Sequence, residues 1–155
     1  MPGVQASGLC TSFKKDLLNG VHAFGSAYRT VDTFKVAFYS IVLDATITAY
    51  TTTGELSTSG YSAGGKPIVN TVAPYLSGSS AIWTSTTDVV WTLGANSSIA
   101  GISMLLYNAT AAGKNAVAFW TSGSTANTQY LPLGGTFTLQ LSGYSPPYNT
   151  LVQIT

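Results

Sequence analysis

One stretch decides the fold class of this chain: Asp32-Thr33-Phe34-Lys35-Val36-Ala37-Phe38-Tyr39. Phe34, Val36 and Phe38 occupy every second position, and a period of two residues is the pattern of a β-strand with one buried face. The apolar run then continues from Ile41 to Leu43. We therefore expect a strand that starts near Asp32.

The rest of the chain after this stretch reads as a series of short strands separated by clusters of Gly, Pro, Ser or Asn. The β-rich runs are Ile47–Thr53, Pro67–Ala73, Asp88–Leu93, Ile99–Asn108, Ala116–Ser122, Gly135–Ser142 and Leu151–Thr155. No helical pattern lies between them, which favours an antiparallel β-sandwich, jelly-roll-like, over a parallel α/β sheet.

The N-terminal part has a different pattern. Residues 1–11 are rich in Gly and Ser, and we expect them to form a flexible arm. Ser12 suits a helix cap, and apolar residues recur with helical spacing after it, at Phe13, Leu17, Leu18, Val21 and Phe24. This predicts one amphipathic helix over 12–24. Residues 12–155 then form a single mostly β domain with that N-terminal helix, since no repeat or linker divides them.

Charge is scarce in this sequence. Charged residues make up 7% of the chain against roughly 25% in an average domain, and the formal net charge is +1. Nucleic acid is therefore not an expected partner, and neither is a membrane, because no apolar run of spanning length occurs. The start, Met1–Gly8, lacks the pattern of a cleaved leader. With so few charges there is little electrostatic repulsion between copies of this chain, which suits a subunit of an assembly. A neutral soluble monomer fits the same composition.

One catalytic pattern matches literally: Gly60-Tyr61-Ser62-Ala63-Gly64 fits the G-x-S-x-G nucleophile elbow of hydrolases. That motif needs a strand, a turn and a helix, with a histidine later in the chain. Pro67 follows closely instead of a helix, and no histidine lies after His22. We therefore expect no catalytic residue here.

The sequence also predicts no metal site and no cofactor. His22 is the single histidine and suits a place in the core, Cys10 is the single cysteine, and the acids are widely separated. A calcium loop needs acids that are close in sequence, and a glycosidase needs two carboxylates that face each other across a cleft. The sequence suggests neither arrangement for its five acids, Asp16, Asp32, Asp44, Glu55 and Asp88. We expect a protein that is not an enzyme.

Three tryptophans leave a binding role open. Trp91 and Trp120 lie in predicted strands and suit the core or a subunit interface, whereas Trp83 has Ser and Thr neighbours typical of a surface. Trp83 is thus the first residue to test for carbohydrate stacking. The Gly- and Ser-rich loop 53–65 is either an adaptable contact or a plain connection.

Several short stretches of sequence, which we call word-like segments, carry a resemblance to a known group of proteins. They are Cys10–His22, Asp32–Tyr39, Thr48–Glu55, Gly60–Lys66 and, more faintly, Ala100–Asn108. With these segments the chain resembles small virion structural proteins of tailed bacteriophages.

This resemblance implies a non-enzymatic cement or decoration protein on the capsid exterior, made in the bacterial host cytoplasm. Its implied partners are the major capsid protein and further copies of itself, as a homodimer or homotrimer. The arm 1–11 and the loop 53–65 would then provide the capsid contacts. A tail, collar or fibre subunit of the virion, a carbohydrate-binding module and an unrecognised enzyme remain as alternatives.

Overall fold

Strands dominate the computed structural model, which describes residues 6–25, 29–95, 100–121, 129–130, 135–141 and 150–155. The strand pairs are antiparallel throughout the described part. The described residues include one helix, α1 (Thr11–Leu18), which precedes most of these strands. This confirms the prediction of a mostly β, antiparallel protein with one N-terminal helix.

The largest sheet has five strands and forms the first layer. Its order is β1-β9-β8-β2-β3, with bounds β1 (Ala6–Leu9), β9 (Ala116–Thr121), β8 (Ser103–Asn108), β2 (Phe34–Tyr39) and β3 (Lys66–Pro67). The strand predicted from the stretch after Asp32 is β2, which lies between β8 and β3. Five of its six residues are buried, because both faces of the strand are covered: Phe34 and Phe38 pack against the tryptophans of the second layer, and the Tyr39 hydroxyl donates to Thr51 O.

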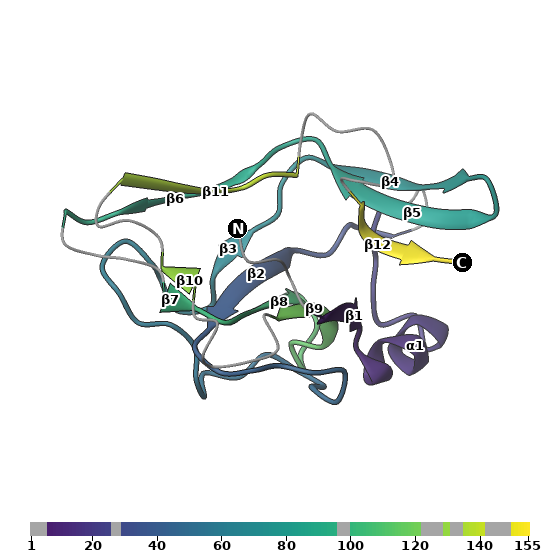
Figure 1. The fold of residues 1–155 in the computed structure, drawn as a ribbon. Coiled ribbons are helices and arrows are strands. Elements are labelled where there is room, and N and C mark those ends of the chain that lie inside the picture. The colour runs from purple at the N-terminus through teal and green to yellow at the C-terminus, as the bar shows by residue number, and fades with distance from the viewer. Residues whose placement is uncertain (1–5, 26–28, 96–99, 122–128, 131–134, 142–149) are drawn as a thin grey trace.

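The second layer is made of smaller sheets that face the first one (Figure 1). They are β12-β5-β4, formed by β12 (Thr150–Ile154), β5 (Ser80–Ser85) and β4 (Thr71–Ser77), and β11-β6, formed by β11 (Gly135–Leu139) and β6 (Val89–Leu93). A short pair, β10 (Gln129–Tyr130) with β7 (Ala100–Gly101), completes the described strands. The arrangement is sandwich-like, while jelly-roll connectivity stays a prediction.

Aromatic side chains hold the two layers together. Phe34 on β2 packs against Trp83 on β5 with ring centroids 4.8 Å apart, and Phe38 packs against Trp91 on β6 at 4.9 Å. Trp83 and Trp91 are 2% and 0% exposed. Large buried aromatic rings contribute much of the apolar surface that a core of this size removes from water.

The helix is shorter than the sequence predicts. It ends at Leu18, because Gly20 takes a φ of +65° and terminates it. Gly20 N donates to Leu17 O, and Val21 N donates to Asp16 O, the paired bonds of a Schellman motif. Gly20 thus terminates the helix inside the range 12–24 that the sequence predicted. The N-cap is also Cys10 rather than Ser12.

The described part of the predicted arm is not a free tail. Ala6 to Leu9 form β1, which pairs with β9 in the register Ala6 to Thr121 and Leu9 to Ala118. Cys10, the next residue, is fully buried. Small residues with little apolar pattern can still complete a sheet through backbone hydrogen bonds, which explains why the sequence pattern missed this strand.

Three other strand predictions need correction. The run Ile47–Thr53 forms only one isolated bridge, from Ala49 to Asn115, and Tyr50 N donates to Lys114 O in the adjoining turn. The runs Pro67–Ala73 and Ile99–Asn108 are divided, into β3 with β4 and into β7 with β8. Strand β5 was not predicted, because its polar start hides a central strand with buried side chains on both faces.

Candidate interaction surface

The segment Gly60–Gly64 is not built as a nucleophile elbow. It lies in turns that lead into the short strand β3, with no helix after it. Ser62 is exposed. The side chain of His22 lies 3.2 Å from the Asn108 amide nitrogen instead of serving a serine. Instead, Tyr61 and Gly64 of this segment donate hydrogen bonds to the carboxylate of Glu55.

Residues 55–65 form a clasp around the carboxylate of Glu55. Oε2 accepts a hydrogen bond from the Tyr50 hydroxyl at 2.5 Å, and Oε1 accepts from the Tyr61 hydroxyl at 2.9 Å and from Gly64 N at 2.7 Å. The Tyr61 hydroxyl also accepts from the backbone N–H of Phe38 at 2.9 Å. Burial raises the pKa of Tyr61 and of Tyr50, which keeps both phenols protonated as donors.

The clasp touches both layers of the sandwich through glycines. A Cβ atom on Gly65 would lie 1.9 Å from Val36 O on β2, and one on Gly60 would lie 2.4 Å from Thr92 O on β6. Only glycine allows such close backbone approach at positive φ. The inner part of the predicted loop 53–65 is therefore a fixed structural connection, and only outward residues such as Ser57 and Ser59 remain exposed.

A second polar cluster fixes the segment that follows the helix. His22 is 7% exposed, which agrees with the core placement expected from the sequence. The Asn108 side-chain amide donates to Asp32 Oδ2 at 2.7 Å and lies 3.2 Å from His22 Nδ1. Burial lowers the pKa of His22, and the charges of Asp16 and Asp32 offset part of that effect. His22 therefore acts as a neutral acceptor toward Asn108.

The cysteine and the acids form no site of recognisable chemistry. Burial, with a smaller effect from the charge of Asp44, raises the pKa of the Cys10 thiol to about 12, so almost no thiolate is present at neutral pH. Among the residues that the structure describes, no three His, Cys, Asp or Glu side chains are grouped to hold a metal ion. In that same part of the chain no helix is long and apolar enough to cross a membrane.

The tryptophan expected at the surface is in the core. Trp83 is 2% exposed, and its Nε1–H donates to Phe24 O at 3.0 Å. Its Ser and Thr neighbours are misleading because most of them lie in the central strand β5 and are buried themselves. Trp91 is in the core as expected, whereas Trp120 on β9 is partly exposed beside a cleft.

The most unusual surface of the described structure is the edge strand β4. Every residue from Val72 to Ser79 is exposed, and the hairpin of β4 and β5 extends to one end of the upper layer (Figure 1). The exposed apolar side chains on or beside this strand form what we call the β4 ridge: Val69, Val72, Tyr75 and Leu76. Leu76, with 77% of its surface exposed, is its most prominent member.

The β4 ridge lies in an interval without any charge. From Pro67 to Thr87 the sequence holds no Asp, Glu, Lys or Arg. Edge strands usually carry charges that discourage association, and β4 carries none. Pro74, which has no N–H to offer an incoming strand, and the irregular pairing between Val72 and Tyr75 give it partial protection. The sequence alone did not single out this interval, because the intervals 89–113 and 115–155 are also uncharged and are longer. The ridge is the candidate functional site.

The likeness to virion proteins rests on the word-like segments alone. No protein-family model matches the chain, and neither a curated protein nor a solved structure is significantly similar to it.

Proposed function

We propose that the chain is a non-enzymatic structural protein of a tailed-bacteriophage virion, a cement or decoration protein that binds the outer surface of the major capsid shell and stabilises it. The observation that carries this proposal is the β4 ridge, an uncharged strand edge with exposed apolar side chains. Exposed apolar surface of this kind marks protein contacts. The resemblance of the word-like segments supports the same class and a place on the capsid exterior.

The chemistry of the ridge defines the kind of contact. Burial of apolar surface contributes roughly 25 cal/mol per Å², and this contribution is not screened by salt. Pro74 has no backbone N–H and therefore interrupts the row of hydrogen-bond donors along β4. The pairing of β4 with β5 also shifts register between Val72 and Tyr75. A continuous added β-ladder is thus disfavoured. We expect side chains, Leu76 first, to insert into an apolar depression of the capsid protein.

The ridge also bears on the oligomeric state. One hairpin offers a small contact, and association costs several kcal/mol of lost rigid-body freedom, so a single copy binds weakly. Linked copies gain affinity because the second binding event is intramolecular. A homodimer or homotrimer would present several ridges to the repeated subunits of a shell, and no like charges on the ridges oppose one another.

The experiment adds purified protein to bare phage heads and follows binding and the temperature at which heads rupture. Leu76→Ser should weaken binding by at least about tenfold, the loss typical of a central apolar contact residue. The matched control is Leu18→Ser, because Leu18 at the end of α1 is 89% exposed but lies outside the ridge. This control should bind as the unaltered protein does, and binding should persist at high salt.

Three outcomes would count against the proposal. Unaltered protein could fail to bind heads, it could bind without raising the rupture temperature, or both leucine variants could lose binding equally. Truncation of residues 1–11 is a less clean test, since it removes β1 and the buried Cys10. Imaging of the assembled particle separates this role from that of a tail, collar or fibre subunit.

A further inference from the structure

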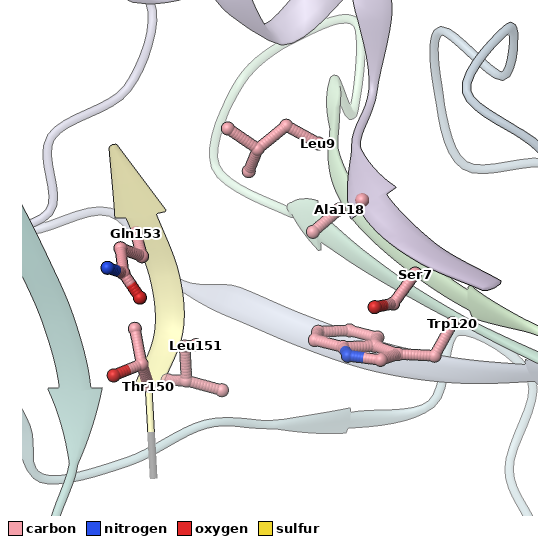
Figure 2. Close-up of a pocket in the computed structure, with 8 residues that line it drawn as sticks. Ser7, Leu9, Ala118, Trp120, Thr150, Leu151 and Gln153 are labelled. Carbon is pink, nitrogen blue, oxygen red and sulfur yellow. The ribbon is translucent and has the colours of Figure 1, made fainter. Parts of the chain in front are cut away.

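A cleft of about 260 Å³ opens between the two layers on the side where β1 and β12 lie. Its first wall comes from the five-stranded sheet, with Leu9, Ala118 and Trp120, and its second wall comes from β12, with Leu151 nearest to the indole (Figure 2). Ser7 pairs with Trp120 across β1 and β9, and its hydroxyl lies beside the ring. The cleft therefore combines an aromatic wall with an adjacent hydroxyl.

Trp120 differs from the other two tryptophans in what surrounds its ring. Trp83 packs against Phe24 and Phe34, and Trp91 packs against Phe38 and Phe137. Trp120 has no such aromatic neighbour among the described residues, and it is partly exposed. One face of an amphipathic ring is thus available to a ligand.

The polar groups at the cleft suit many weak hydrogen bonds. β1 and β12 are each the last strand of their sheet, so part of their backbone N–H and C=O groups has no partner strand in the described structure. Ser7 adds a hydroxyl. Thr150 and Gln153 belong to the second wall, but Figure 2 shows their side chains directed away from Trp120, and the Gln153 amide donates to Ser80 Oγ at 3.1 Å.

Among the residues that the structure describes, the lining contains no charged side chain. A phosphate, carboxylate or ammonium group would therefore enter without a counter-charge and would lose hydration. The volume is below the range of roughly 300–1,000 Å³ typical of drug-sized ligands, so the site holds about one ring. A ligand needs one apolar face for Trp120 and several hydroxyls around its edge. We propose that this cleft binds one ring of a neutral carbohydrate, with Trp120 as the stacking residue.

The two buried tryptophans make the test direct. Because Trp83 and Trp91 are in the core, a ligand that stacks on Trp120 should change the intrinsic fluorescence of one residue only. The full-length protein is titrated with maltose, lactose and di-N-acetylchitobiose up to about 10 mM, which nearly saturates a site with a Kd near 1 mM. At least one of these sugars should give a saturable change in emission.

Variants assign the response to the cleft. Trp120→Ala should weaken sugar binding, measured by calorimetry, by at least about fivefold, and Trp120→Phe should retain part of it, since stacking survives in a smaller ring. Tyr75→Ala, which removes an exposed aromatic residue of the β4 ridge, should leave sugar binding unchanged. A uronic acid of similar size should bind more weakly than the neutral sugars.

Several results would overturn the assignment: no response to any of the three sugars, unchanged calorimetric binding after Trp120→Ala, or stronger binding of the uronic acid. A loss of binding with Tyr75→Ala would place the sugar on the ridge and would also contradict it. None of these results bears on head binding through Leu76, so failure of the cleft and failure of the capsid role are separate.

Discussion

Substitution of Gly65 by alanine tests whether the clasp lies against β2 as closely as the structure shows. Gly65 has a φ of +65°, and its new Cβ would lie 1.9 Å from Val36 O. That oxygen belongs to the backbone of a buried central strand, so it cannot move without shifting the sheet. Gly78 offers a matched control, because its φ of +61° is nearly the same and no atom lies within 4 Å of its Cβ position.

The two substitutions share one energy term and differ in another. A residue with a side chain in the left-handed region costs roughly 1–2 kcal/mol, and this cost applies to both alanines. Forcing extra volume into packed structure adds roughly 1–3 kcal/mol, and this cost applies to Gly65 alone. The difference in free energy of unfolding should therefore be about 1–3 kcal/mol.

Thermal unfolding followed by circular dichroism measures this difference. For a domain of this length, 1 kcal/mol shifts Tm by roughly 2–4 °C, so Gly65→Ala should melt about 2–12 °C below Gly78→Ala. If both variants melted within about 1 °C of each other, the close approach of Gly65 to Val36 would be refuted.

Two further predictions concern the polar clusters. Tyr61→Phe leaves the Phe38 N–H without its acceptor and removes one donor to Glu55, so urea unfolding should show a loss of about 1–3 kcal/mol; a loss below about 0.5 kcal/mol would contradict the clasp. The pKa of His22 is lowered in the folded state, so the unfolded state binds more protons as pH falls. The stability contributed by neutral His22 is present above about pH 6.5 and is lost as pH falls below it through the folded pKa. Urea midpoints between pH 7 and pH 5 should fall, and His22→Gln should flatten that decline; an equal decline in both proteins would exclude His22 as its source.

The spacing of apolar residues predicted the elements that bury one face of a strand or helix. β2 was predicted because Phe34, Val36 and Phe38 alternate, and the mostly β class followed from similar runs. The helix was placed correctly, but its end was not: apolar spacing predicted a helix that continues through Gly20 to residue 24, whereas Gly20 terminates it. A glycine after Asn19 is compatible with either outcome until the hydrogen bonds to Leu17 and Asp16 are known.

The remaining differences arise where burial depends on distant neighbours. Trp83 was expected at the surface because Ser and Thr surround it, yet most of these neighbours lie in β5, between β4 and β12, and are buried there. Glu55 and Tyr61 gave no local signal either, because the clasp exists only when the loop returns to β2. The β4 ridge could not be predicted from its lack of charge, because longer uncharged intervals follow it, and its exposure results from β4 being the last strand of its sheet.

The pairing of β1 with β9 has a consequence for synthesis. Residues 6–9 are translated before their partner strand, 116–121, which is made roughly 110 residues later. At about 5–20 residues per second this is a wait of roughly 5–20 s, which is long compared with the time in which a hairpin forms. During that interval the nascent chain carries an unpaired strand and a helix without its sheet. The five-stranded sheet of the described structure can therefore be completed only after residue 121 has been translated.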